Sequence, residues 1–236
     1  MMISWRGGHL PEPQVRTGED MREVMADPNC SISGPLYTMY RDVTESDADR
    51  AWLQDHTLRY DITVIPAGTC GVEYAKTKGH YHPAGPGGMS YPEMYQVLEG
   101  RAHYLLQRKD LTDIVVVDAS AGDIVLIPPE YGHVTINPAH ETLVMANIVS
   151  TRFQSEYGVY EKLKGGAYYE MEGGEFVKNQ HYPAISPLRW ITPPSLEPLR
   201  IPATKRLYDL IGNYQALEVL NAPEKFIAAL RDLLTG

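Results

Sequence analysis

Hydrophobic and polar residues alternate in a series of short segments through the middle of the chain. In the clearest one, residues 58–64, an extended strand would separate an apolar face from a polar face, with Leu58, Tyr60, Ile62 and Val64 against Arg59, Asp61 and Thr63. Turn residues separate it from strand-like segments at 72–82, 93–99, 102–108, 113–118, 123–127, 134–137 and 143–150, and a hairpin is expected at 171–178. Short strands at this spacing predict an all-β sandwich or barrel, and not a parallel α/β sheet.

Helical patterns occur only toward the two ends of the chain. Near the start, Thr17 can cap a short helix and Thr44 or Ser46 can begin a second one, with a strand expected between them at 31–42. Near the end, six prolines in residues 183–202 indicate an irregular arm, and Asn221 can cap a last helix. We expect the apolar stripe of that helix to be buried on the outer face of the barrel or on a second subunit, and it consists of Phe226, Ile227, Leu230, Leu233 and Leu234.

The length of 236 residues suits one all-β domain with additions at both ends, and a second full domain is not required. No internal repeat divides the chain further. We therefore predict a strand and short helices packing on the barrel in residues 1–55, the barrel itself in 56–182, and a Pro-rich arm with C-terminal helices in 183–236.

The chain is acidic, with a formal net charge of -9 at pH 7 and a sequence pI of about 5.3. No Lys/Arg-rich run interrupts this charge, which makes nucleic acid and anionic membrane surfaces unsuitable partners. Cys30 and Cys70 form no Cys-x-x-Cys pair, so we expect reduced thiols in a cytoplasmic protein. The sequence shows no apolar core of a signal peptide and no apolar window long enough to span a membrane.

Two histidines have a spacing that suits metal binding. His80 and His82 are two residues apart, so a strand would direct both imidazoles to one face. Glu93 follows a Gly/Pro-rich connection and His133 lies about forty residues further on, which offers four ligands for one divalent ion. A single His-x-His pair among eight histidines arises easily by chance, and so the combination with Glu93 and His133 carries the prediction.

The spacing of these residues also resembles that of a known fold. His-x-His, a Gly-rich turn, Glu93 and a strand ending in Gly100 are followed by Gly-x5-Pro-x4-His-x3-Asn from Gly122 to Asn137. This order is similar to the two-part signature of the cupin barrel. The resemblance implies an all-β fold made of a single cupin barrel, a double-stranded β-helix or jelly roll, with short N-terminal helices and a C-terminal helical extension.

Residues from Tyr37 to Val177 resemble, more narrowly, the cupin-type glucose-6-phosphate isomerases of archaea and some bacteria. The matching stretches, in family order, are Thr63 before Pro66-Ala-Gly68, Glu73-Tyr-Ala-Lys-Thr-Lys-Gly-His-Tyr-His82, Glu93-Met-Tyr95, Leu105-Leu-Gln107, Ile127-Pro-Pro129 with His133, and Tyr157-Gly158. The chain departs from the family in a longer connection after His82, in Val149 for a pocket tyrosine and in Ser155 for a histidine. The resemblance implies one divalent metal per chain, Fe2+ before Mn2+, Zn2+ or Ni2+, held by His80, His82, Glu93 and His133.

The resemblance also implies an activity, the interconversion of glucose 6-phosphate and fructose 6-phosphate. Two residues are expected to act in the reaction, Glu93 as the base that relays a proton between C1 and C2, and Tyr95. A metal-stabilised cis-enediolate would form in that case, whereas a hydride shift would leave Glu93 as a ligand only. Hydroxyl groups, a backbone N–H and one cation would bind the sugar phosphate, and they belong to Tyr37, Thr63, Thr77, Lys78, Gly79, Tyr95 and Tyr157.

Other functions could use the same four ligands. A metal-dependent cupin dioxygenase would bind iron there and favour a more apolar pocket. A sugar-binding or storage cupin would catalyse nothing, and an isomerase or epimerase of another phosphosugar would differ only in its pocket contacts. The expected partner is a small-molecule sugar phosphate, and the expected assembly is a homodimer, because one barrel leaves open sheet edges and the apolar tail offers further area.

Overall fold

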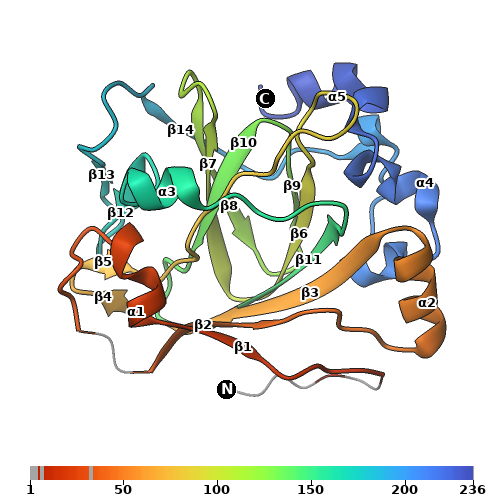
Figure 1. Ribbon diagram of the computed structural model, residues 1–236, viewed down its shortest axis with the longest axis horizontal. Helices are drawn as coiled ribbons and strands as arrows, with labels where there is room; N and C mark the ends of the chain where they lie inside the picture. Colours follow the sequence, from red (N-terminus) through yellow and green to blue (C-terminus); the bar gives the residue numbers. More distant parts are fainter. Residues whose placement is uncertain (1–4, 6–7, 32–33, 236) are drawn as a thin grey trace.

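Two β-sheets lie face to face in this computed structural model, which describes residues 5, 8–31 and 34–235 (Figure 1). The strands are β1 Gln14–Thr17, β2 Pro35–Tyr40, β3 Leu58–Ile65, β6 Glu93–Glu99, β7 Arg101–Arg108, β8 Ile114–Ser120, β9 Ile124–Ile127, β10 Tyr131–Ile136, β11 Leu143–Ser150 and β14 Leu188–Ile191. They form a six-stranded sheet, β1-β2-β3-β11-β6-β9, and a four-stranded sheet, β10-β7-β8-β14. This arrangement confirms the predicted all-β jelly-roll class.

The strand boundaries follow the predicted alternation closely. Neighbouring strands in both sheets are antiparallel, except that β14 pairs in parallel with β8. The main hydrophobic core lies between the sheets and includes Tyr95 and Val97 of β6 and Tyr104 and Leu106 of β7. Within the described residues the sheets do not join into one closed hydrogen-bonded barrel.

The two faces of the six-stranded sheet differ in polarity. In the register of β3 with β11, Asp61 is beside Asn147 and Thr63 is beside Met145. This face looks into the sandwich, toward a pocket described below. The opposite face of β3, with Tyr60 and other apolar residues, belongs to a second hydrophobic cluster outside the sandwich. The alternation at 58–64 is therefore confirmed, and its polar side is the inner one.

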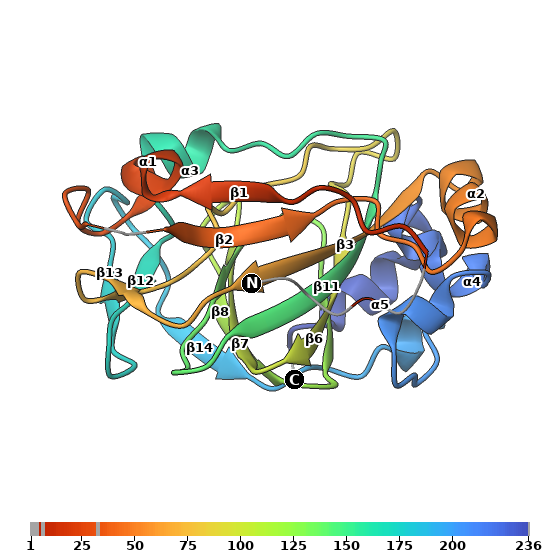
Figure 2. The same cartoon turned by 90° about the horizontal axis from the view of Figure 1, so that it is seen from below.

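The C-terminal segment supplies the second hydrophobic cluster. Its elements are η2 Glu197–Leu199, η3 Leu207–Leu210, α4 Tyr214–Leu217, η4 Glu218–Leu220, η5 Pro223–Phe226 and α5 Ile227–Asp232, and they group beside α2 Asp47–Asp55 in both views (Figures 1 and 2). Their buried side chains pack with Tyr60, Ile62 and Ile148 of the six-stranded sheet. Of the two expected burial places, most of the stripe thus occupies the outer face of its own barrel, through Phe226, Leu230 and Leu233. Leu234 joins the main core and Ile227 is exposed. None of the described helices is long and apolar enough to cross a membrane.

Two details of this C-terminal region differ from the prediction. Asn221 caps no helix: its Nδ2 donates to the His56 carbonyl at 2.7 Å and its Oδ1 accepts from Ser150 Oγ at 2.7 Å, because distant polar groups bind it instead. The next helical turn, η5, has Ala222 at its N-cap and no side-chain cap. The Pro-rich arm contains a strand that was not predicted, β14, whose pairing with β8 depends on a segment more than sixty residues away.

The segment predicted as one strand at 72–82 is broken. Its regular part is β5 Glu73–Tyr74, which pairs with β4 Thr69–Cys70 just before the segment. After β5, single bridges join Lys76 to Ile136 and His80 to His133. Gly79 interrupts the extended backbone with a φ of 80°. A Cβ at this position would also lie 2.6 Å from the Tyr160 ring, so both the backbone angle and the close approach require glycine.

The short helices near the start of the chain form where their caps predict them. Thr17 and Asp20 make a capping box around α1 Gly18–Met21, and Ser46 Oγ accepts from the Asp49 N–H at the start of α2. The strand expected at 31–42 is β2, and residues 32–33 lie outside the described part of the chain. The remaining elements are η1 Arg22–Val24, α3 Gly158–Lys162, and the paired strands β12 Tyr168–Glu170 and β13 Phe176–Lys178, which confirm the expected hairpin.

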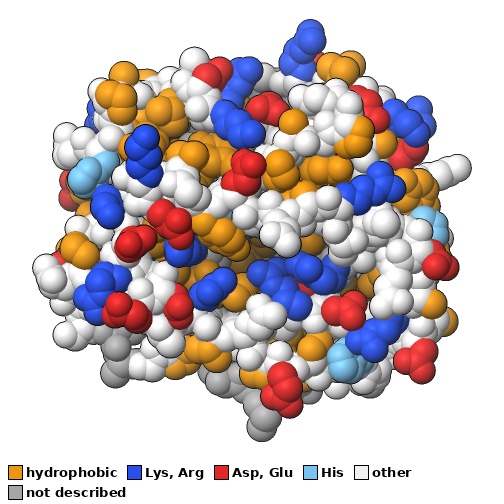
Figure 3. All heavy atoms as spheres, in the orientation of Figure 1, with side chains coloured by type: hydrophobic (Ala, Val, Ile, Leu, Met, Phe, Trp, Pro, Cys, Tyr) orange, Lys and Arg blue, Asp and Glu red, His pale blue; other side chains and the backbone are white. Residues whose placement is uncertain are grey.

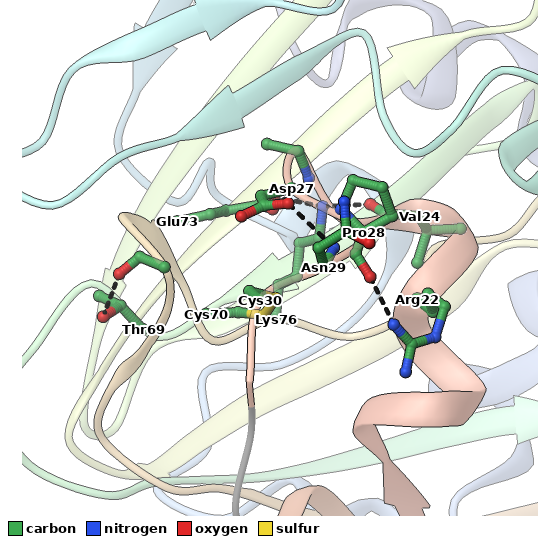
Figure 4. The surroundings of a disulfide bond; sticks show 12 residues. Arg22, Val24, Asp27, Pro28, Asn29, Cys30, Thr69, Cys70, Glu73 and Lys76 are labelled. Atoms are coloured by element: carbon green, nitrogen blue, oxygen red, sulfur yellow. Dashed lines mark hydrogen bonds and ion pairs between the residues drawn. A yellow bond between two sulfur atoms is a disulfide. The ribbon is translucent and has the colours of Figure 1, made fainter.

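A disulfide joins Cys30 to Cys70, contrary to the prediction of reduced thiols (Figure 4). The chain after η1 folds back over β4 and brings two residues that are 40 apart in sequence to a Cα distance of 5.5 Å. Beside it, a buried ion pair joins Lys76 to Glu73, and Lys76 Nζ donates to the Val24 carbonyl at 2.8 Å. The disulfide and the hydrogen bond from Lys76 to Val24 fasten the N-terminal segment to the stretch that leads directly into the predicted site.

We expect the buried part of the tail to stabilise the whole fold. Leu217→Ala removes a fully buried side chain from the second hydrophobic cluster and should lower the free energy of unfolding by about 2–5 kcal/mol. Ile227→Ala is the matched control, since Ile227 is 46% exposed and its loss should cost less than about 1 kcal/mol. Urea denaturation with an unchanged m-value measures both. Equal effects of the two variants would contradict burial of the tail on the sheet.

Candidate metal centre and substrate pocket

The four predicted metal ligands come together from three parts of the chain. His80 and His82 lie on the irregular stretch after β5, Glu93 begins β6, and His133 lies in β10. Backbone hydrogen bonds in both directions, at 3.2 and 3.1 Å, pair His80 with His133 and hold the two imidazoles close together. The pairing of β11 with β6 carries Glu93 to the same place across the sandwich.

The donor atoms converge on one point. Glu93 Oε2 lies 3.8 Å from the Nε2 of His80, 3.3 Å from that of His82 and 3.4 Å from that of His133. The Nε2 atoms of His80 and His82 are 3.0 Å apart, and all four donor atoms lie within 4.8 Å of one another. Two donors at right angles around an ion, each about 2.1 Å from it, are separated by about 3.0 Å, so the spacing fits one ion.

The hydrogen bonds behind the cluster also fit a metal. His82 Nδ1 is 2.7 Å from the Tyr91 carbonyl, which can only accept, so Nδ1 carries the hydrogen and Nε2 presents its lone pair to the cluster. Glu93 Oε1 accepts a hydrogen bond from Asn147 Nδ2 at 2.8 Å. Glu93 Oε2 is buried and makes no hydrogen bond within the described residues. A bound cation would satisfy this oxygen, and the donor set of three nitrogens and one oxygen suits a divalent transition ion.

The protonation states of the donor side chains also favour metal binding. Burial lowers the pKa of His80 well below its usual range, with the neighbouring His133 and His82 adding to the effect, and burial lowers the pKa of His133 in the same direction. Burial by itself would raise the pKa of Glu93, but its contacts with His133 and His82 outweigh this and hold the pKa well below 4.5. Neutral imidazoles beside an ionised carboxylate are the forms that bind a metal.

A cavity of about 430 Å³ opens beside this cluster. Its walls come from the six-stranded sheet, from residues 77–80 and from the stretch before α3. They include Tyr37, Thr63, Thr77, Lys78, Gly79, Tyr95 and Tyr157, as well as His80 and Glu93. The structure therefore brings every predicted substrate-binding residue to one pocket. Val149 and Ser155, where the chain departs from its family, line the same pocket.

Hydrogen bonds hold several of these residues in place. Thr77 Oγ1 accepts from the Thr135 N–H at 2.9 Å, and Tyr37 Oη accepts from the Lys78 N–H at 3.4 Å. The Tyr95 hydroxyl lies 3.0 Å from His133 Nε2, next to the donor cluster. Burial, followed by the Glu93 charge, raises the pKa of Tyr95 well above 10.0, so this hydroxyl keeps its proton.

Several polar residues of the pocket were not predicted from the sequence, among them Arg41, Arg59 and Asn147. Arg59 shares the polar face of β3 with Thr63, so the alternation offered a signal for it. Asn147 interrupts an otherwise apolar strand, which was a weaker signal. Lys78 was expected to be the one positive charge of the site, and this is wrong, because its Nζ pairs with Glu161 at 2.7 Å while two arginines line the pocket.

A jelly roll that carries three imidazoles and a carboxylate around one point defines the class of protein, a cupin with a complete set of metal-binding side chains. A family model described as glucose-6-phosphate isomerase matches residues 15–186. This match takes in most of the chain, and the chain therefore belongs to the glucose-6-phosphate isomerase family. The matched range encloses the residues on which the resemblance rested.

Curated relatives of this chain are also named glucose-6-phosphate isomerase. The chain is 29% identical over 122 residues to the glucose-6-phosphate isomerase of Thermococcus onnurineus, a region that covers 52% of this chain and 62% of the relative. It is 30% identical over 118 residues to that of Thermococcus gammatolerans, covering 50% and 60%. The chain thus matches less than two thirds of the length of these relatives.

Solved structures show only a distant likeness. A variant of Bacillus subtilis oxalate decarboxylase superposes with a TM-score of 0.38 at 18% identity, covering 52% of this chain and 28% of that one. Peruvianin-I, a cysteine peptidase from Thevetia peruviana latex, superposes with a TM-score of 0.34 at 16% identity, covering 43% and 56%. Likeness at this level adds nothing to the family assignment.

We expect His133 to be required for metal binding. His133→Ala removes one of four donors and should lower the metal content, after equilibration with a limiting divalent ion, below about one tenth of the wild-type value. His140→Ala is the matched control, because His140 is exposed and is not one of the four donors. This variant should bind metal as the wild type does. Elemental analysis measures the content. Full metal content in His133→Ala would contradict the assignment of β10 to the site.

Proposed function

We propose that this chain interconverts glucose 6-phosphate and fructose 6-phosphate with the help of one divalent metal ion. The observation that supports this most strongly is the convergence of four donor atoms beside a pocket rich in hydroxyl groups and cations. A volume of about 430 Å³ suits a ligand of this size. Membership of the glucose-6-phosphate isomerase family supports the same reaction.

The residues that would hold the metal are His80, His82, Glu93 and His133. When bound, a divalent ion supplies positive charge that stabilises negative charge on two neighbouring sugar oxygens. Our first choice is Fe2+, and Mn2+, Zn2+ or Ni2+ would also suit imidazole ligands, unlike Mg2+ or Ca2+, which prefer oxygen.

Glu93 and Tyr95 are the proposed catalytic residues. Glu93 is ionised at neutral pH because of its low pKa, and Asn147 fixes its Oε1, so the carboxylate is ready to accept a proton in a defined orientation. Tyr95, whose hydroxyl keeps its proton, can donate a hydrogen bond to an oxygen of the reacting sugar. A relay through Glu93 would carry the proton between C1 and C2, whereas a hydride shift would move hydrogen directly between these carbons.

The other predicted residues would orient the rest of the sugar. Tyr37, Thr63 and Tyr157 offer hydroxyl groups to the pocket, and Thr77 and Gly79 border it on the side of α3. These groups support a polyhydroxyl ligand more than the apolar substrate that a dioxygenase pocket would favour. Val149 and Ser155 also face this ligand, so another phosphosugar could be isomerised as well.

We expect anaerobic turnover of fructose 6-phosphate to glucose 6-phosphate by metal-loaded protein, without nucleotide or flavin. A chelator should abolish the activity, and added Mn2+ or Fe2+ should restore it. A coupled assay for glucose 6-phosphate measures the rate, and His133→Ala serves as the metal-free control. Absence of turnover with several phosphosugars, together with oxygen uptake on another substrate, would favour the dioxygenase.

The role of Glu93 can be tested in the same assay. Glu93→Gln keeps an oxygen for the metal but cannot accept the proton, so a proton relay predicts loss of solvent-hydrogen incorporation at C2 with metal retained. Product that never acquires solvent hydrogen in the wild-type protein would instead support the hydride shift. Metal content must be measured in each sample, because Glu93 is also a proposed ligand.

We further propose a homodimer located in the cytoplasm. Apart from the exposed Ile227, the apolar stripe of the tail is buried within the chain. The edge strands of the two sheets, β1 and β9 in one and β10 and β14 in the other, are therefore the main remaining reason for pairing. Light scattering should give twice the chain mass, and a monomer at micromolar concentration would contradict the dimer. Recovery of the protein in an extracytoplasmic fraction would contradict the proposed location. The Cys30–Cys70 disulfide is one argument against the cytoplasm, because reducing conditions there disfavour disulfides.

A further inference from the structure

A fully buried carboxylate holds two arginines at the wall of the pocket. Asp61 has a side chain with no exposed surface, and it accepts from Arg41 Nη1 at 2.7 Å and from Arg59 Nε and Nη2 at 2.7 and 2.8 Å. The backbone N–H of Asp42 donates to the same carboxylate at 3.0 Å. These bonds fix both guanidinium groups in orientation.

The two arginines also remain available to a ligand. Both line the pocket, and their side chains are 31% and 33% exposed. The bonds to Asp61 use Nε and Nη2 of Arg59, and in the described part of the chain its Nη1 makes no hydrogen bond. Lys and Arg side chains gather beside a hollow near the centre of this face, in the region of β2 and β3 (Figures 1 and 3).

The sheet places this cluster close to the donor atoms. Asp61 is beside Asn147 in the pairing of β3 with β11, and Asn147 is beside Tyr95 in the pairing of β11 with β6. In the adjacent row Arg59 is beside Val149, which is beside Glu93. The backbone of Arg59 therefore lies two strands, or about 10 Å, from that of Glu93, and Arg41, which follows β2, lies one strand further.

The charges distinguish this side of the pocket from the side of Lys78. Two arginines and one aspartate leave a net charge of +1 around Asp61. Lys78 is neutralised by its ion pair with Glu161, and its side chain is 17% exposed. A dianionic group entering the pocket gains more from the arginine pair, which also presents the planar, forked donors that match phosphate oxygens.

We propose that Arg41 and Arg59, oriented by Asp61, bind the phosphate group of the sugar phosphate in this chain. The identity of the sugar rests on the proposed function, but phosphate binding at this cluster does not require turnover. Asp61 is a positioning residue, since it reaches the ligand only through the arginines. Lys78 then contributes less to phosphate binding than the sequence predicts.

The test uses glucitol 6-phosphate, a sugar phosphate that cannot isomerise, and glucitol, which lacks the phosphate. Calorimetry on metal-loaded protein should show that Arg59→Gln weakens glucitol 6-phosphate binding about tenfold or more, because charge-assisted hydrogen bonds are lost, and leaves glucitol binding unchanged. Arg59→Lys, which keeps the charge but loses the fork, should be intermediate. Lys78→Gln should weaken binding less than Arg59→Gln does.

Controls separate this proposal from a folding defect and from the isomerase proposal. Arg108→Gln removes an arginine whose ion pair with Asp110 lies outside the pocket, and it should bind both probes as the wild type does. A thermal midpoint and metal content equal to the wild type show that Arg59→Gln is folded. If the wild type turns over fructose 6-phosphate, Arg59→Gln should raise KM more than it lowers kcat.

Two results would overturn the proposal. One is a loss of glucitol 6-phosphate affinity in Lys78→Gln that equals or exceeds the loss in folded Arg59→Gln, which would assign the phosphate to the side of Lys78. The other is wild-type protein that binds glucitol 6-phosphate no better than glucitol. If the phosphate probe binds through Arg59 but no phosphosugar is turned over, the isomerase proposal fails and the phosphate site stands.

Discussion

Placing an ionised carboxylate in the interior among three imidazoles is the constraint on which this structure depends. A buried charge of this kind is costly unless hydrogen bonds and an opposite charge compensate for it. Asn147 binds one oxygen of Glu93, and three imidazole nitrogens surround the other. The site therefore needs the inner surfaces of both sheets, because neither sheet carries all four donors.

That requirement explains the unusual polarity of the six-stranded sheet. Its inner face carries Arg59, Asp61, Thr63 and Asn147, so polar groups take up part of the surface between the sheets. The C-terminal tail compensates by covering the outer face and burying a second hydrophobic cluster there. Burial of apolar side chains on the outer face thus contributes stability that the polar inner face does not supply.

The same reasoning connects the charged groups of the pocket with its function. Asp61 would be very unfavourable at its buried position without Arg41 and Arg59, and the arginines would be mobile without Asp61. Holding them in place costs little further entropy when an anion binds, which is the advantage of a preorganised site. Lys78 lacks this arrangement, because Glu161 already pairs with it at 2.7 Å.

The sequence by itself determined the class of fold and most strand positions, because alternation is a local property of the chain. It also indicated the four donors, His80, His82, Glu93 and His133, because their order matches the signature of a known fold. Only the tertiary structure decided that Cys30 meets Cys70 and that the polar face of β3 turns inward. Tertiary contacts also gave Asn221 partners that prevent it from capping a helix. These outcomes depend on which distant segments come together, and local propensity carries no information about a partner forty or more residues away.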